Sequence, residues 1–465
     1  MLQGGGNVLG LLGGLARAAA TARLVAAADI GAYAIALVAI GLAVRAGGLG
    51  IASAMYHLQP ATTTYRRCLG LGGASGLLAG AIAGLTCAMT LGTEDAWPLA
   101  LAVGLGAGGQ VVAEIAGTQL GLRLAYGPLA AAGAGARTLG DVLAIAAIAW
   151  SPDFGGLLIG LGLQGITLAI IFLLADYRNG VWSSGADPAD APGLPAILRL
   201  GGITVVDGFI TFGIARLDRL IVSHVYGLGT LGYYELVATL AERPLQLVIT
   251  TVRGVYAPLI TRYVGRASAL RTVHRSYVGH VGLLMAPATV VALCFGGSLL
   301  ELLYGRAYGA YWGVYAALVT LAWVKSTGLP IWQHIVATGR MRLSIYVNLT
   351  IGALRAVVLF GAALVLPLAS AIGVYVTTRS VLALAFEHHM RRRYFATDLR
   401  AAAAPLLPHF ARAIFAVLLW WPVARTLPSY RWYDAAAILG TGLTYVVLSR
   451  RELSAGWGSL RGRRV

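Results

Sequence analysis

The sequence predicts an all-α, polytopic membrane protein with about 14 transmembrane helices. Of its 465 residues, 58% are hydrophobic and only 11% are charged, and the mean hydropathy is +0.76. Soluble globular chains carry about 25% charged residues. Mostly apolar stretches also recur along the chain at about 20 residues each, which is the length a helix needs to cross a bilayer. These observations exclude a soluble fold.

The predicted spans are mostly apolar stretches separated by short polar connections. Their approximate ranges are 4–22, 31–53, 68–90, 97–119, 128–150, 155–176, 200–222, 231–260, 278–300, 311–334, 344–366, 369–390, 406–422 and 432–449. The first stretch is weakly hydrophobic and begins with glycines. It lacks the basic start of a secretory signal peptide, so we interpret it as a retained span.

One long polar connection divides the chain. The sequence WSSGADPADAPGLP within residues 178–199 is rich in Pro, Gly and Asp, which is typical of a linker. It predicts an N-terminal six-helix lobe at 1–177, a cytoplasmic linker at 178–199, a second six-helix lobe at 200–390, and a helix pair with a basic tail at 391–465. Arg23-Leu24-Val25 resembles Arg219-Leu220-Ile221 at the corresponding place in each lobe. Transporters built from repeats place their substrate site between the halves, so we expect a central cavity.

The net charge of +17 is distributed in a way that indicates membrane orientation. Arginines concentrate in alternate loops, for example at Arg66 and Arg67 and at Arg391 to Arg393, whereas the other loops are short and carry few cations. Only Arg425 and Arg431 weaken this pattern. Because cytoplasmic loops hold the excess of Lys and Arg, both termini are predicted to be cytoplasmic, and nucleic acid is not an expected partner.

The sequence gives no sign of a bound cofactor. The three cysteines show neither a metal-ligand spacing nor a disulfide framework. No phosphate-binding Gly-rich loop is present, so direct use of ATP by this chain is not expected. A coupling ion, H⁺ or Na⁺, is the remaining small partner.

Several cations fall inside predicted spans, where each costs about 2.5 to 3.5 kcal/mol if it is left facing lipid. They must therefore face water or a counter-ion. A water-filled cavity lined by guanidinium groups suits a phosphate-bearing substrate, because guanidinium offers paired donors to phosphate oxygens. The candidate substrate-binding residues are Arg45, Arg137, Arg216, Arg219, Lys325, Arg355 and Arg379. The competing interpretation is structural pairing, as between Arg137 and Asp141, which share a helix face.

The seventh span carries both signs of charge. At 100° per residue Asp207 and Asp218 align on one stripe, while Arg216 and Arg219 point to the other side. We expect the basic stripe to face the cavity and the acidic stripe to pair with cations on neighbouring helices. Asp207 and Asp218 are also candidates for binding a coupling ion.

Two further carboxylates are candidates for the coupling ion. Glu235 and Glu242 lie seven residues apart in the eighth span and share a face, and carboxylates within a membrane commonly bind protons or ions. The alternative for Glu242 is local compensation by the adjacent Arg243.

Three stretches carry a family resemblance. They are LDRLIVSHVYGLGTLGYYELVATLAERPLQLV followed by YAPLITRY (217–248 and 256–263), AADIGAYAIALVAI (27–40), and TGRMRLSIYVNL (338–349). Together they resemble the bacterial polysaccharide flippases, which belong to the superfamily that includes the multidrug and toxin extrusion antiporters. The resemblance implies a two-lobed bundle that alternates between leaflets and moves a lipid-pyrophosphate-linked oligosaccharide outward across the bacterial cytoplasmic membrane.

The resemblance also sets the expected partners and the alternatives. The partners are the lipid-linked oligosaccharide, membrane lipids, and the polymerase and other polysaccharide-assembly proteins. A drug or toxin antiporter of the same superfamily is the nearest alternative, although cationic drugs favour acid-lined cavities. A membrane polymerase or ligase would need a sizeable outer loop, and the predicted outer loops are short. A pure scaffold would not need so many charges within its spans.

Overall fold

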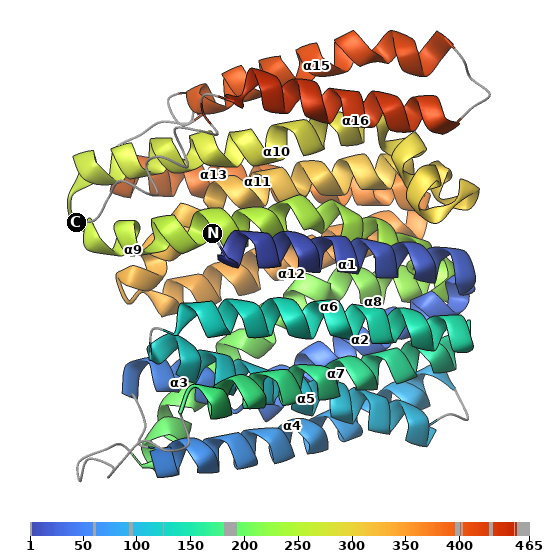
Figure 1. The fold of residues 1–465 in the computed structure, drawn as a ribbon. Helices are drawn as coiled ribbons and strands as arrows, with labels where there is room; N and C mark the ends of the chain where they lie inside the picture. The colour runs from blue at the N-terminus through green and yellow to red at the C-terminus, as the bar shows by residue number, and fades with distance from the viewer. Residues whose placement is uncertain are drawn as a thin grey trace. The chain divides into compact units, whose positions relative to one another are not determined.

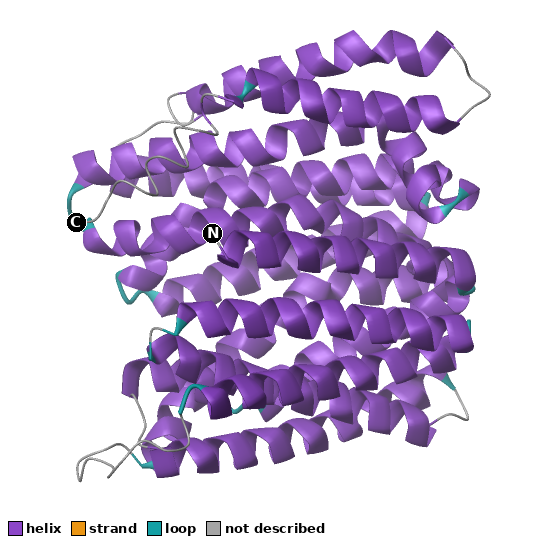
Figure 2. Cartoon of the chain, in the orientation of Figure 1, coloured by secondary structure: helices purple, strands orange, loops and turns teal. Residues whose placement is uncertain are grey.

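A computed structural model gives the fold of the chain. It describes residues 2–58, 62–92, 96–123, 125–180, 193–395, 400, 403–426, 431–450 and 452. Within these ranges every regular element is a helix (Figure 2). The predicted all-α, polytopic membrane fold is confirmed. The described residues form two compact units, one of Met1–Leu236 with Asn348–Ala356 and one of Val237–Val347 with Val357–Val465.

The first unit is built around helix α5. Its helices up to the long polar connection are α1 (Leu2–Leu24), α2 (Ala27–Gly47), α3 (Ile51–Leu58), α4 (Thr62–Leu91), α5 (Ala96–Leu122), α6 (Tyr126–Trp150) and α7 (Phe154–Arg178). Helix α5 packs between α4 and α7, α6 packs against α7, and α1 packs against α6 (Figure 1). Because α5 has neighbours on several sides, its small apolar residues are mostly buried.

Helices α4 and α5 approach closely through glycines. A Cβ atom added at Gly80 would lie 2.7 Å from the Cα of Gly104, and one at Gly84 would lie 2.6 Å from the Cα of Ala100. Helix packing in lipid depends on such small residues, because lipid tails are as apolar as leucine. The four-residue spacing of Gly76, Gly80 and Gly84 therefore serves packing.

Helix α8 (Leu194–Leu247) consists of two helical arms that meet at Gly227, where the backbone is not helical (φ 83°, ψ 168°). The seventh and eighth predicted spans lie on either side of this break. The eighth predicted span ends early, because a π-helix (Val248–Arg253) and the short α9 (Gly254–Arg262) follow. Pro244, which lacks a backbone donor, lies four residues before this change in helix type.

The second unit is organised around helix α10. Its elements are α10 (Ala267–Tyr304), η2 (Arg306–Tyr311), α11 (Trp312–Ala337), α12 (Met341–Val365), α13 (Leu368–Met390), η3 (Arg391–Phe395), η4 (Ala404–Leu406), α15 (Leu407–Thr426) and α16 (Arg431–Leu448). Helix α10 packs against α11, α15 and α16, and α11 packs against α13 (Figure 1). The middle of α12, Asn348–Ala356, belongs to the first unit.

The number of spans is less well defined than the fold class. Within the described residues, 11 helices are long and apolar enough to cross a membrane. The count treats α8 as one helix, leaves out the weakly apolar α1, and classes Asp434–Leu448 as a shorter apolar helix. The predicted total of about fourteen is therefore not confirmed. The predicted lobe boundaries stay predictions, and residues 181–192 of the predicted linker lie outside the described residues.

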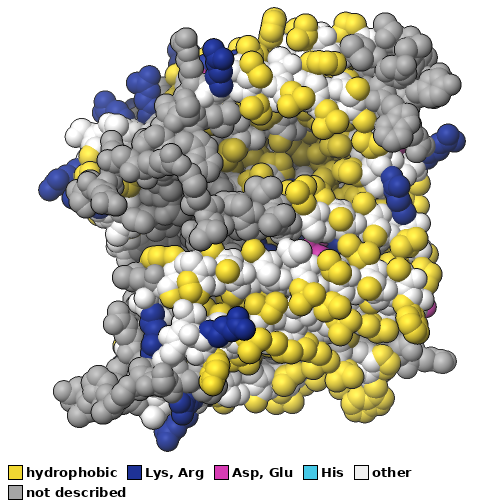
Figure 3. Space-filling view, in the orientation of Figure 1, with side chains coloured by type: hydrophobic (Ala, Val, Ile, Leu, Met, Phe, Trp, Pro, Cys, Tyr) yellow, Lys and Arg dark blue, Asp and Glu magenta, His cyan; other side chains and the backbone are white. Residues whose placement is uncertain are grey.

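The first unit exposes an apolar surface. Over α4 and α7, hydrophobic side chains cover the middle of the face in view, and Lys and Arg side chains lie toward its left-hand edge (Figure 3). Leu78, Ile82 and Ile159 are among the exposed apolar side chains of these two helices. An apolar band bounded by cations is what a lipid-facing surface requires.

Candidate functional site

The kink in α8 is held by backbone packing on α2. A Cβ atom added at Gly31 would lie 1.9 Å from the carbonyl oxygen of Leu228, and one at Gly232 would lie 1.9 Å from that of Ala27. The positive φ at Gly227 is a conformation that L side chains rarely adopt. Glycine is therefore required at the kink and on both sides of this contact.

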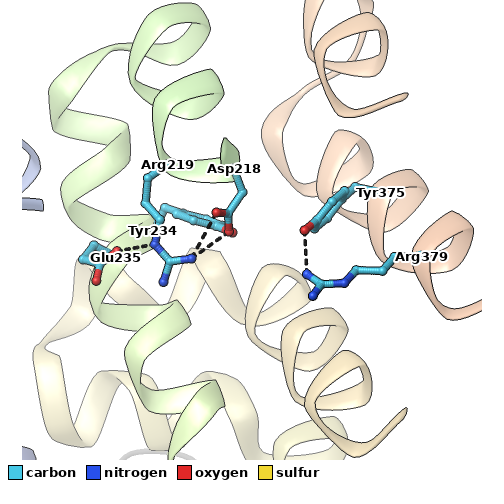
Figure 4. A network of polar contacts seen from close by, with 6 residues as sticks. All are labelled: Asp218, Arg219, Tyr234, Glu235, Tyr375 and Arg379. Atoms are coloured by element: carbon cyan, nitrogen blue, oxygen red, sulfur yellow. Dashed lines mark hydrogen bonds and ion pairs between the residues drawn. The ribbon is translucent and has the colours of Figure 1, made fainter. Parts of the chain in front are cut away.

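A buried charge network connects the two arms of α8 across the kink. The Arg219 Nε donates to the Glu235 carboxylate at 2.9 Å, and its Nη1 donates to both oxygens of Asp218 at 2.9 and 3.1 Å. The Tyr234 hydroxyl donates to Asp218 at 2.5 Å (Figure 4). Arg219 is only 2% exposed, and Asp218 and Glu235 are 7% exposed each. In this low-dielectric setting such pairs are strong, and losing one partner is costly.

This geometry modifies the expectation drawn from the helical wheel. The wheel placed Asp218 and Arg219 on opposite stripes, yet the long guanidinium side chain turns back to contact its neighbour. The kink then brings Glu235 beside Arg219, 16 residues earlier in the chain. Sequence reasoning did not single out Tyr234, although its position next to Glu235 could have suggested it.

Arg216 lies three residues before Arg219 in a different environment. It is partly buried, and its guanidinium lies 5.7 Å from the centre of the Phe212 ring, a cation–π contact. Among the described residues no carboxylate pairs with it. Its charge therefore remains available to an anion, while that of Arg219 is shared between two acids.

The other predicted cations of the first unit are arranged in three ways. Arg45 lies 3.9 Å from Glu114, and both side chains are nearly half exposed. Arg137 is exposed. Arg355, in the middle of α12, donates from Nε to the Ile351 carbonyl of its own helix at 3.1 Å. Among the described residues, neither Arg45 nor Arg137 joins the network at the kink.

The proposed pairing of Arg137 with Asp141 is replaced by another ion pair. Asp141 is buried and lies 3.4 Å from the Arg17 Nε of α1. Arg17 also donates to the Gln164 side chain at 3.0 Å. Sequence reasoning missed Arg17, because a span of weak hydropathy gave no reason to search it for a buried charge.

In the second unit, two predicted cations lie within helices. Arg379 of α13 donates to the Tyr375 hydroxyl at 2.7 Å and lies over that ring, 5.8 Å from its centre (Figure 4). Lys325 is partly buried in α11. Glu242 is partly buried in α8, and the adjacent Arg243 contacts Gln246 at 3.5 Å. The predicted role of each of these groups stays a prediction.

Asp207 is the remaining candidate for the coupling ion. It is partly buried in the first arm of α8, and its Oδ1 atom has no hydrogen-bond partner among the described residues. It does not join the network at the kink.

Two further buried polar contacts were not foreseen. The Tyr65 hydroxyl donates to Asp176 between α4 and α7, and both residues are fully buried. In the second unit Arg391 donates to Glu387 at 2.7 Å and to the Thr327 carbonyl at 3.3 Å. The four-residue separation of Glu387 and Arg391 was a usable signal for a helical pair.

The fold agrees with those of known transporters over most of the chain. The structure of the lipid II flippase MurJ in an inward closed conformation has a TM-score of 0.70 and 14% identity, over 96% of this chain and 97% of that one. An inward-facing multidrug resistance MATE family transporter of the MOP superfamily has a TM-score of 0.61 and 13% identity, over 83% and 94%. A MOP superfamily transporter from Pyrococcus furiosus gives 0.59 and 16%, over 84% and 93%. At these identities the likeness establishes the fold alone, which this chain shares with the three structures.

Sequence comparison assigns the chain to a family. The profile of the polysaccharide biosynthesis protein family matches residues 20–312, and the chain belongs to that family. The lipopolysaccharide biosynthesis protein WzxC of Escherichia coli K12 is 23% identical over 172 residues, which is 37% of this chain and 34% of that protein. The match therefore spans about a third of this relative. The resemblance inferred from residues 27–40 and 217–263 is confirmed at the level of the family.

Proposed function

We propose that the protein is a secondary transporter that moves a lipid-pyrophosphate-linked oligosaccharide across the bacterial cytoplasmic membrane during surface polysaccharide synthesis. Family membership over residues 20–312 is the observation that carries this proposal. The agreement in fold with a lipid II flippase supports it, because that protein is named for a lipid-linked cargo. On this proposal the chain is not an enzyme, and both of its termini are cytoplasmic.

Phosphate recognition is assigned to the cations within the helices. Arg216 is the foremost candidate, because the described residues provide no carboxylate for it. Arg45, Arg137, Lys325, Arg355 and Arg379 are further candidates, and Arg219 would take part only after leaving its acids. Guanidinium groups bind phosphate oxygens through paired donors, which suits a pyrophosphate headgroup.

Transport would proceed by alternating access, with the lipid tail remaining in the bilayer. Asp218, Glu235, Asp207 and Glu242 are the proposed sites for a coupling H⁺ or Na⁺, because carboxylates within membranes are suited to that role. A polymerase and other polysaccharide-assembly proteins would receive the product.

The test is replacement of Arg216 in a strain that depends on this gene. Arg216→Ala should abolish surface polymer and leave lipid-linked oligosaccharide on the cytoplasmic side, while Arg216→Lys should retain part of the activity. Arg66→Ala, which removes an exposed arginine, is the control. Membrane levels of all variants are measured by immunoblot. Normal polymer with Arg216→Ala would refute the assignment of this residue.

A strain that lacks the gene distinguishes the flippase function from the antiporter function. Loss of the gene should cause lipid-linked oligosaccharide to accumulate with unchanged sensitivity to cationic drugs. Unchanged lipid-linked pools with increased drug sensitivity would instead favour a multidrug antiporter, the function named for structures of the same fold.

A further inference from the structure

Six exposed arginines surround one end of the second unit. They are Arg262, Arg266, Arg271, Arg275, Arg392 and Arg393, here called the basic collar. The helix ends that carry them meet in a common buried cluster, to which Ile260 of α9, Leu270 of α10 and Phe395 of η3 belong. In Figure 3 the dark blue side chains at the upper left lie toward the end where α10 begins. The three segments that carry the collar therefore pack together at this end of the second unit.

The length of α10 places the collar at headgroup depth. This helix has 38 residues and at 1.5 Å per residue is about 57 Å long. The hydrocarbon core of a bilayer is about 30 Å thick. The apolar part of α10 begins at Val278, so its first turns, with Arg271 and Arg275, extend beyond the hydrocarbon.

An aromatic side chain lies between two cations beside the collar. The Tyr394 ring centre lies 5.2 Å from the guanidinium of Arg340 and 5.7 Å from that of Arg393, and Arg340 also donates to the Tyr394 hydroxyl. Tyrosine is enriched at membrane interfaces, where its ring contacts apolar groups and its hydroxyl contacts water. The collar thus combines two features of a headgroup-binding surface.

Among the described residues, little negative charge lies close to the collar. Glu387, the carboxylate nearest in sequence among the described residues, is buried and pairs with Arg391 at 2.7 Å. Within the described ranges none of the six collar arginines forms an ion pair. Their charge is therefore directed at an external anion.

We propose that the basic collar binds the phosphate headgroups of anionic phospholipids in the leaflet at this end of the molecule. Six exposed cations spread over three helix ends exceed what one pyrophosphate headgroup can contact, which favours several lipids over the transported cargo. Each arginine near an anionic membrane surface adds about 1 kcal/mol of attraction to that surface, and this attraction falls off within a Debye length. The proposal does not require the transport function to be correct.

The test is retention of phosphatidylglycerol by the purified full-length protein, measured by native mass spectrometry with phosphatidylcholine as the reference lipid. The wild type should retain several phosphatidylglycerol molecules in preference to phosphatidylcholine. Arg271→Gln/Arg275→Gln should weaken retention by about fivefold for each arginine removed. Arg271→Lys/Arg275→Lys should restore it, because the surface is attracted by charge. Gel filtration and circular dichroism establish that each variant is folded.

Arg66→Gln/Arg67→Gln removes two exposed arginines from the first unit and is the matched control. An equal loss in this control would overturn the proposal, because the arginines would then act only through net charge. Absence of a preference for phosphatidylglycerol would also overturn it. Inorganic phosphate and diphosphate are added in a separate arm, and displacement of the lipid by millimolar phosphate would show a free-anion site instead.

Discussion

Each unit has a buried arginine that is paired with carboxylates, and the two arginines are paired in different ways. In the first unit Arg219 serves two carboxylates and connects the arms of α8 on either side of Gly227. In the second unit Arg391, the first residue of η3, pairs with one carboxylate four residues earlier in α13 and donates to a backbone carbonyl of α11. A guanidinium that is shared across a kink depends on the angle between the two arms, whereas a pair within one helical turn does not. A change in the angle between the arms of α8 would therefore alter the first network. The second network holds α13 and α11 together.

The largest effect is expected from Arg219→Ala. This change removes the guanidinium that Asp218 and Glu235 share, and breaking a buried pair in this way costs about 3 to 5 kcal/mol of unfolding free energy. Thermal and denaturant unfolding of the detergent-purified protein measure the loss. The triple variant Asp218→Asn/Arg219→Met/Glu235→Gln should recover most of the stability, because it removes the two carboxylate charges together with the guanidinium. If Arg219→Ala were as stable as the wild type, the network at the kink would not stabilise the fold as expected.

Arg391→Ala is expected to have a smaller effect, about 3 kcal/mol at the lower end of the range for broken buried pairs. Only Glu387 is left alone, and it can be neutralised by taking up one proton. The same unfolding measurements apply. Surface polymer per folded molecule should remain near the wild-type level for this variant, and a transport defect without a loss of stability would show that the network does more than fasten α13 to α11.

Arg216→Ala sharpens the comparison, because it removes a cation from the same helix without breaking an ion pair with a described residue. Its contact with the Phe212 ring is worth about 0.5 to 1 kcal/mol. We therefore expect a stability loss below about 1 kcal/mol, far less than for Arg219→Ala. Losses of equal size would mean that Arg216 also has a structural partner.

The smallest effect is expected at Asp153, which caps α7 at the surface. Its carboxylate accepts from the Ser151 hydroxyl at 2.7 Å and from the Gly156 N–H at 3.0 Å. These contacts, the Ser151 bond first, hold the pKa of Asp153 below its usual value of 3.8. Because the folded-state pKa is lowered, the stabilisation is present above about pH 3.8 and is lost as the pH falls through the folded-state pKa.

Asp153→Asn tests this pH dependence. Unfolding temperatures of the wild type and the variant should differ slightly at neutral pH and converge in acid. A gap that widens on acidification would contradict the assignment. The Asp153 cap thus shows how much an exposed carboxylate contributes to stability, for comparison with the two buried networks.

Much of the fold could be predicted from hydropathy alone. Apolar stretches of membrane length are specified locally, and the structure places helices at nearly all of them. The break in α8 at Gly227 was predictable, because the sequence HVYGLGTLG between the predicted spans contains the glycines of a turn. The contact of this segment with α2 was not predictable, because it depends on tertiary packing at Gly31 and Gly232.

The site was predictable in its charges but not in their pairing. Arg219, Asp218 and Glu235 were all identified, because charges are rare in apolar sequence. Their mutual contact depends on the kink angle, which a helical wheel does not contain. For Asp141 the local partner at four residues was plausible, and the observed partner Arg17 comes from a helix far away in the sequence. Long-range pairing of this kind requires the tertiary structure.

The two-sided glycine contact between α2 and α8 also limits how the first unit can deform. At Gly31 and Gly232 the main chains of the two helices touch with no room for a methyl group, so neither helix can slide along the other by a residue without a collision. Helix α2 also touches the first arm of α8, because a Cβ atom added at Gly41 would lie 1.9 Å from the Phe212 ring. Both arms of α8 therefore pack tightly on α2, and a cysteine pair introduced at either contact would report on movement of that arm relative to α2.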